Sequence, residues 1–71
     1  MNKEYTIELL EDFKIHEEET AYTLGGILND TRTDLSAEEL YEINEMRFVH
    51  IRNCKVAKKM IWRRQNRKKV R

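Results

Sequence analysis

His50 and Cys54 come nearest, by type and spacing, to a reactive or metal-binding pair in this chain. Residues four positions apart lie on one side of an α-helix, so the two side chains can face a common ligand. A zinc site needs four ligands drawn mainly from Cys and His, and His16 is the only further histidine. A Cys–His nucleophile needs a third group that orients the base, and the sequence indicates none. We expect a packed thiol and a half-buried histidine, with no metal and no cofactor.

Other catalytic patterns are missing from the sequence. Gly25 and Gly26 are not followed by Lys and Ser or Thr, so the phosphate-binding P-loop pattern is absent. A 71-residue chain has little interior in which to desolvate a pair of catalytic carboxylates. The single cysteine, Cys54, excludes an intrachain disulfide and favours a reducing compartment. The sequence therefore predicts a non-enzymatic, cytoplasmic protein.

Charge divides the chain into two opposed parts. Residues 1–46 contain thirteen acidic and three basic residues, a net charge of −10. Residues 47–71 contain eleven basic residues and no acidic one, so the parts nearly cancel to an overall charge of +1. Such asymmetry indicates binding to nucleic acid or to an acidic surface, and it can equally mean that the two parts neutralise each other.

The basic residues near the end of the chain form the leading candidate site. Dense positive charge attracts phosphate backbones through counterion release, and Trp62 can stack on an unpaired base. In composition the segment resembles arginine-rich helices that bind RNA. We predict a small regulatory protein that binds nucleic acid or a ribonucleoprotein; an acidic protein surface and a merely solubilising tail are the alternatives. The predicted contacts are Lys55, Lys59, Arg63, Arg64, Arg67, Lys68, Lys69 and Arg71.

The acidic part supports a rival hypothesis of a different class. A dense negative patch can occupy the nucleic-acid groove of another protein, a device used by small inhibitors from phages and mobile elements, such as anti-CRISPRs. Only size and composition support this analogy to an inhibitor or adaptor with a host protein target. The alternative is a solvated helix face that pairs with the basic part. The patch consists of Glu8, Glu11, Asp12, Glu17, Glu18 and Glu19.

A helix from Ala37 to about Arg64 is the clearest structural prediction. Ser36 and Glu39 have the spacing of a capping box, in which each side chain accepts from the other's backbone N–H. An apolar stripe with helical spacing follows: Leu40, Ile43, Met46, His50, Ile51, Cys54, Ala57, Ile61 and Trp62. A second apolar line lies opposite, so we expect the helix to pack against a second neighbour, in a homo-oligomer or on another protein. The predicted partner-binding residues are Val49, Val56, Met60 and Trp62.

Residues 3 to 24 or 28 also have helical spacing of apolar side chains. Gly25 suits the position just after such a helix, and Glu17–Glu19 interrupts the apolar pattern, which allows a bend. Residues 29–34 are polar and turn-forming. The fold class is therefore all-α: one domain over residues 1–71, folded as an antiparallel helical hairpin, with a basic tail at 64–71 that has room to be flexible.

The hairpin itself predicts a seam of opposite charges between its helices. Such pairs are each worth about 0–1 kcal/mol, and as a set they favour antiparallel pairing. No run of 18 apolar residues is present, so we expect no membrane contact, and the acidic start does not resemble a secretory signal. The expected seam places Glu4, Glu8, Glu11, Asp12 and Glu17 beside Arg52, Lys55, Lys59 and Arg63.

Overall fold

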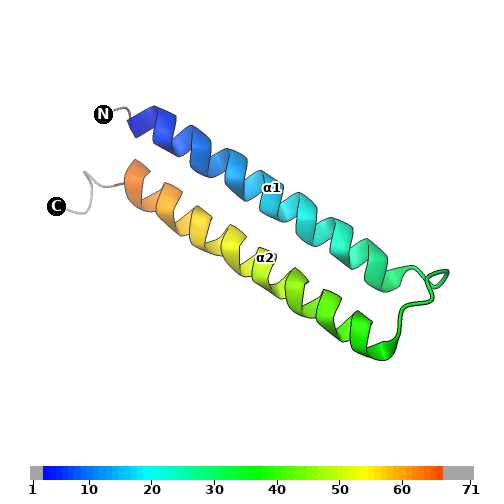
Figure 1. Ribbon diagram of the computed structural model, residues 1–71. Coiled ribbons are helices and arrows are strands. Elements are labelled where there is room, and N and C mark those ends of the chain that lie inside the picture. Colours follow the sequence, from blue (N-terminus) through cyan, green and yellow to red (C-terminus); the bar gives the residue numbers. More distant parts are fainter. Residues whose placement is uncertain (1–2, 67–71) are drawn as a thin grey trace.

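Two antiparallel helices make up the part of the chain that the structure describes (Figure 1). The computed structural model describes residues 3–66, in which α1 runs over Lys3–Asn29 and α2 over Ala37–Gln65. The hairpin measures 53 × 20 × 15 Å, and the free ends of both helices lie at the same end of the molecule. The prediction of an all-α hairpin is confirmed, and the predicted bounds of the second helix agree with α2 to within one residue.

The start of α2 is fixed by the predicted capping box. The backbone N–H of Glu39 donates to Oγ of Ser36 (3.1 Å), and the N–H of Ser36 donates to Oε1 of Glu39 (2.9 Å). Each side chain thus satisfies a backbone donor that has no partner within the helix. Glu38 and Glu39 also place negative charge in the first turn, where the helix dipole favours it.

Gly25 does not end the first helix, so the predicted end at residue 24 is wrong, whereas the alternative end at residue 28 agrees with α1 to within one residue. Helix α1 continues through both glycines to Asn29, and no glycine in residues 3–66 has a positive φ. Ile27 and Leu28 are half-buried, so continuing the helix keeps these two apolar side chains partly out of water. That burial outweighs the weak tendency of glycine to end a helix. The acidic run Glu17–Glu19 likewise leaves α1 continuous.

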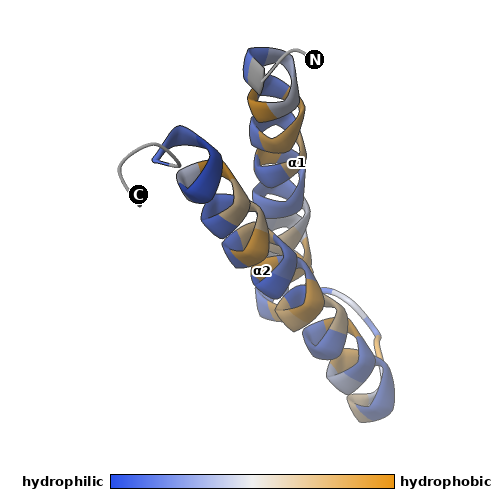
Figure 2. Ribbon diagram, turned by 90° about the vertical axis from the view of Figure 1, so that its left-hand side faces the viewer, coloured by the Kyte–Doolittle hydropathy of each residue, from blue (hydrophilic) through white to orange (hydrophobic). Residues whose placement is uncertain are grey.

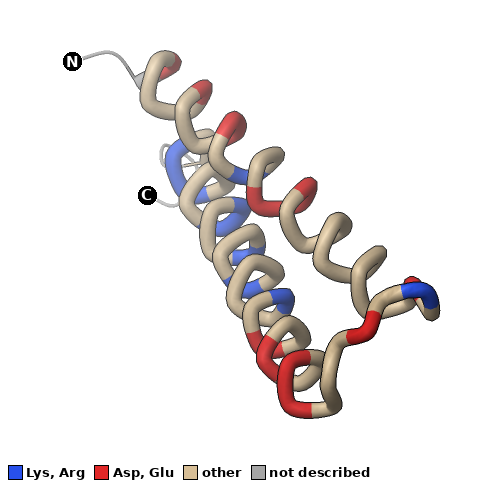
Figure 3. The backbone as a smooth tube through the Cα atoms, turned by 45° about the vertical axis from the view of Figure 1, so that its right-hand side comes forward, with Lys and Arg blue, Asp and Glu red and all other residues tan. Residues whose placement is uncertain are grey.

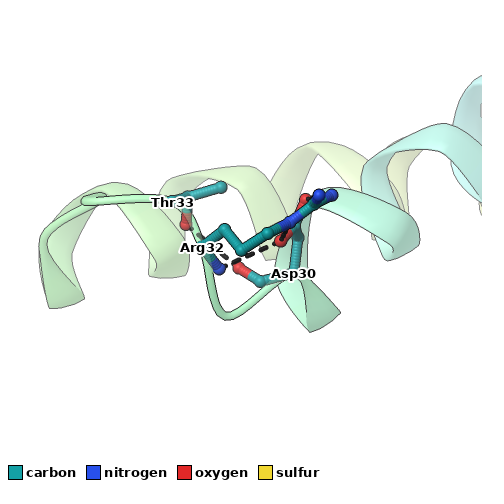
Figure 4. Close-up of polar contacts among 3 residues, drawn as sticks. All are labelled: Asp30, Arg32 and Thr33. Atoms are coloured by element: carbon teal, nitrogen blue, oxygen red, sulfur yellow. Dashed lines mark hydrogen bonds and ion pairs between the residues drawn. The ribbon is translucent and has the colours of Figure 1, made fainter.

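The turn between the helices is organised by Asp30 (Figure 4). Its carboxylate accepts from the backbone N–H of Arg32 at 3.0 Å and from Nε and Nη2 of the same residue at 2.9 Å each. The hydroxyl of Thr33 donates to the carbonyl of Asp30 (3.2 Å). The guanidinium of Arg32 lowers the pKa of the Asp30 carboxyl, and the pKa of Arg32 is raised in return.

The core of the hairpin is thin. Among the described residues, the buried side chains are Cys54, Ala57 and Ile61, all on the face of α2 toward α1. Two members of the predicted stripe, Met46 and Trp62, lie at its edges and are exposed. Figure 2 shows the helices inclined to one another, with hydrophobic positions recurring along both. A two-helix layer therefore leaves much of its apolar surface uncovered.

Neither helix in residues 3–66 is long and apolar enough to cross a membrane.

Candidate binding surfaces

One polar cluster joins the two helices near their middle. Oε1 of Glu17 lies 2.7 Å from Nδ1 of His50 and accepts from Nδ2 of Asn53 at 3.0 Å. An ionised carboxylate only accepts, so Nδ1 of His50 carries the proton in this contact. The hydrogen bond from Asn53, and next that from His50, lower the pKa of Glu17. The Glu17 side chain is only 13% exposed, so this carboxylate belongs to the helix interface and not to the predicted acidic patch.

Cys54 lies in the same interface as a packed thiol. Burial, and next the negative charge of Glu18, raise the pKa of Cys54, which keeps the thiol protonated and weakly nucleophilic. His50, four residues earlier, is occupied by Glu17. Within residues 3–66, no group of three His, Cys, Asp or Glu side chains is arranged to hold a metal ion. His50 and Cys54 thus pack between the helices, His50 in a hydrogen bond with Glu17 and Cys54 as a buried thiol.

Four cations form a stripe along the outer side of α2, which we call the basic stripe: Arg52, Lys55, Lys59 and Arg63. They recur at spacings of three and four, so they share one helix face, and all are exposed. Among the described residues, none has a carboxylate within 4.0 Å; the pairs between the helices are His50–Glu17 and Lys58–Glu18. The predicted seam of opposite charges is therefore wrong, because the basic stripe lies away from the α1 interface.

The structure brings only some of the predicted nucleic-acid-binding residues together on one surface. Lys55, Lys59 and Arg63 lie together in the basic stripe, and Nε of Arg63 donates to the carbonyl of Lys59 (3.4 Å). Arg52 completes the stripe; the sequence prediction omitted it, although its spacing of three from Lys55 was a usable signal. Arg64 is half-buried on another side of α2. Arg67, Lys68, Lys69 and Arg71 lie outside the described residues.

Trp62 is accessible next to the basic stripe. It is 58% exposed and borders a shallow hollow with Glu11 and Lys14 of α1. The indole therefore does not pack into the core, although it belongs to the predicted apolar stripe. Lys58, in the same hollow, is directed to Glu18, at 4.0 Å between Nζ and Oε2.

The outer side of α1 carries the opposite charge. Figure 3 shows acidic positions along α1 and basic positions along the C-terminal half of α2. We call the following exposed carboxylates the acidic face: Glu4, Glu8, Glu11, Asp12 and Glu19. Within residues 3–66 none is paired with Lys or Arg, and Glu19 lies 3.8 Å from His16. The hairpin thus presents a negative edge and a positive edge.

An open apolar groove of about 570 Å³ runs along one broad face, between the helices. Val49, Val56 and Met60 of α2 line it together with Leu10 and Phe13 of α1. These α2 residues were predicted to lie opposite the interface with α1, but they border α1 instead. The residues of α2 buried at the centre of the interface include the small Ala57 and Cys54, so the larger side chains beside them lie at its edge. Trp62 does not line this groove. The structure therefore separates it from the other predicted partner-binding residues.

The opposite broad face has a second, more polar groove. Arg47 lies in it with Tyr22, Ile51 and Lys55, and its guanidinium carbon is 5.3 Å from the ring centre of Phe48. Nε of Arg47 is buried and has no hydrogen-bond partner among the described residues. The two broad faces therefore differ in chemistry, one apolar and one cationic.

Comparisons with protein families, with curated proteins and with solved structures find no match to this chain. The surfaces described above are thus the basis on which a function is inferred. Of these surfaces, the two charged edges and the apolar groove are the ones left without a partner inside the hairpin.

Proposed function

We propose that this protein is a small, non-enzymatic nucleic-acid-binding regulator that contacts phosphates through the basic stripe of α2, on free nucleic acid or within a ribonucleoprotein. The observation that supports this function is the lack of carboxylate partners for four neighbouring cations that share one exposed helix face. Counterions released from phosphates favour such a contact, since no internal ion pair must first be broken.

The dimensions and flanking groups of the stripe fit this function. From Arg52 to Arg63 the helix rises by about 16 Å at 1.5 Å per residue, enough to follow several phosphates of one strand. Trp62, exposed beside Arg63, offers an aromatic surface on which an unpaired base can stack. We therefore expect tighter binding to single strands or to RNA with unpaired bases than to plain duplex DNA.

A salt series with neighbouring single substitutions tests this proposal. Binding to a fluorescent single strand, a structured RNA and a duplex is measured by anisotropy at several salt concentrations. Lys59→Gln removes a stripe cation, whereas Lys58→Gln removes an equal charge from the adjacent residue that faces Glu18. Lys59→Gln is expected to weaken binding and to reduce the salt slope by about 0.7–0.9, the contribution of one phosphate contact. Lys58→Gln is expected to change both much less.

Removing the whole stripe gives the strongest version of this test. The variant Arg52→Gln/Lys55→Gln/Lys59→Gln/Arg63→Gln keeps good helix formers at all four positions, so circular dichroism should remain unchanged. Its binding at low salt should fall toward background. No binding by the natural chain at low salt, or equal losses from Lys58→Gln and Lys59→Gln, would contradict the proposal.

A second candidate function rests on the acidic face of α1. These exposed carboxylates also lack Lys or Arg partners within residues 3–66, so they are available to a cationic groove on another protein. The protein would then act as an inhibitor or adaptor of the kind that phages and mobile elements carry, by protein contact or by mimicry of nucleic acid. Negative charge spaced along a helix resembles a row of phosphates in its electrostatics.

Charge reversal separates the two candidates only if the helix interface is spared. Glu17 is excluded because it bonds to His50 and Asn53, and Glu18 because it faces Lys58. Glu8→Lys/Glu11→Lys/Asp12→Lys should abolish capture of a protein target from nuclease-treated host lysate, while leaving phosphate binding intact or stronger. Loss of every captured protein after nuclease treatment of the natural chain would rule out this second function.

A further inference from the structure

The apolar groove continues into a larger uncovered surface. Val49 is 54% exposed and Phe13 is 44% exposed, although both are large apolar side chains. Leu9, one turn before Phe13, extends the surface along α1 and is also exposed. Contiguous apolar surface of this kind on a small protein marks a contact with another molecule. We define the apolar face by six residues: Leu9, Leu10, Phe13, Val49, Val56 and Met60.

We propose that a second copy of this chain covers the apolar face, forming a four-helix bundle with its two-fold axis parallel to the helices. The hairpin buries only three side chains in its described part, too little core for a chain of this size to be stable alone. A standard interface buries roughly 800 Å² per partner, about an eighth of the chain's 6129 Å² surface. One broad face of a hairpin with extents of 53 × 20 Å can supply that area.

The charges beside the apolar face select the direction of the axis. Cations border the face along α2: Arg52 lines the apolar groove, and Arg63 lies beside Met60 and Leu10. An axis parallel to the helices sets α1 of one copy against α2 of the other, so the cations that border the face on the two α2 helices are kept apart. An axis perpendicular to the helices sets α1 against α1 and α2 against α2, so like charges meet.

The position of the apolar face along the hairpin supports the same axis. Five of the six residues lie in the half of the molecule near the free ends of the helices and Val49 lies close to its middle, whereas the half near the turn carries Glu42 and Glu45 at the corresponding positions of α2. A parallel axis keeps every residue at its own height, so the apolar halves superimpose completely. A perpendicular axis through the centre of the hairpin would place apolar side chains against polar ones. The proposed dimer therefore brings both C-terminal ends of α2 to one end of the bundle.

Sedimentation equilibrium of matched variants tests the surface. Val56→Glu places a carboxylate in the groove twice per dimer, and should raise the dissociation constant by about 100-fold or more. Glu is a better helix former than Val, so loss of helix is not expected to cause this change. Phe13→Glu is an independent second variant from α1. Tyr22→Glu is the control, since Tyr22 is 85% exposed and lies in the groove on the opposite face.

Spin labels at Tyr41→Cys test the axis by pulsed electron paramagnetic resonance. Natural Cys54 is buried, so the unsubstituted chain supplies the labelling background. With the parallel axis the two labels lie at equal height, and their distance reflects only the bundle width, of order 30 Å. With a perpendicular axis through the centre of the apolar face, position 41 of each copy lies fourteen residues, or about 20 Å along the helix, from the axis. The two labels lie on opposite sides of the axis, so they are offset by about 40 Å along the bundle.

Each result has a defined meaning for the proposal. A concentration-dependent dimer that is weakened by both groove variants, retained by Tyr22→Glu, and has the shorter label distance supports it. A folded monomer at high micromolar concentration overturns it. A dimer that resists both groove variants shows that another face is used and also overturns it, and a long label distance overturns the parallel axis.

Discussion

On the side of α2 toward α1, polar side chains find partners across the interface, whereas on its outer side the basic stripe finds none among the described residues. Glu17 accepts from both His50 and Asn53, yet Arg52 and Lys59 have no carboxylate within 4.0 Å in residues 3–66, although α1 is rich in carboxylates. The rotation of α2 about its own axis causes this difference. Burial of apolar side chains determines that rotation, and the rotation in turn determines which polar side chains of α2 reach a partner on α1.

The comparison implies that stability depends on the inner face and that binding depends on the outer one. Burial of apolar surface is the dominant favourable term in folding, whereas exposed ion pairs contribute little. The interface between the helices holds the three buried side chains of α2 and the nearly buried carboxylate of Glu17. The cations on the outer side of α2 remain available to bind another molecule. Substitutions on the two faces should therefore separate folding from binding.

The largest effect is expected at Ile61, which is 8% exposed and lies against α1. Ile61→Ala should cost about 2–4 kcal/mol of unfolding free energy, since it removes packed methylenes from a very small core. Its neighbour Trp62 provides the control, because Trp62→Ala changes a larger side chain that is mainly exposed. Urea denaturation followed by circular dichroism, at fixed protein concentration, measures both. Equal losses from the two variants would contradict the distinction between the faces.

The next effect is expected at the polar cluster. Glu17→Gln keeps the volume of the side chain but replaces a charged acceptor, so it should cost about 1 kcal/mol at neutral pH. Glu18→Gln is the neighbouring control, because Glu18 makes only a 4.0 Å contact with Lys58. Chemical denaturation at pH 7 measures both variants. A smaller loss from Glu17→Gln than from Glu18→Gln would show that the cluster does not hold the helices together.

The same carboxylate gives the hairpin a defined dependence on acid. Hydrogen bonds from Asn53 and next from His50 lower the pKa of folded Glu17, so the unfolded chain takes up its proton first as the pH falls. The contribution of Glu17 is complete above its unfolded pKa of about 4.3 and is lost as the pH drops through the lower folded pKa. The stability difference between the natural chain and Glu17→Gln should therefore shrink from pH 6 to pH 3. A constant difference would contradict this linkage.

The glycine pair tests how far local sequence signals determine the helix. Gly26 lies inside α1 without a positive φ, and a Cβ added there meets nothing within 4 Å. Gly26→Ala should therefore stabilise the fold by about 0.5–1 kcal/mol, the usual gain within a helix. At Gly25 the added Cβ would lie 3.7 Å from Cδ of Arg47, an ordinary contact, so Gly25→Ala should also be tolerated. A loss of thermal stability in both variants would indicate that α1 ends before them.

Signals that act over a few residues made the start of α2 predictable. Ser36 and Glu39 are three positions apart and bond only to each other's backbone, so their geometry needs no tertiary information. The end of α1 was left open between residues 24 and 28, because the partial burial of Ile27 and Leu28, which favours the longer helix, depends on tertiary packing. The prediction of a seam of opposite charges was wrong for the same reason. The sequence shows which residues are charged, but the partners of Glu17 depend on how α2 is rotated.

The smallest stability effect is expected on the outer face of α2, where binding should change most. Lys59→Gln and Arg52→Gln remove cations that have no carboxylate within 4.0 Å in residues 3–66, so each should change the unfolding free energy by less than about 0.5 kcal/mol. Both variants should nevertheless lower the salt dependence of nucleic-acid binding. Denaturation and anisotropy on the same samples measure the two quantities together. A large loss of stability from either variant would mean that the stripe holds the hairpin after all, because a cation without an internal partner has little to contribute to folding.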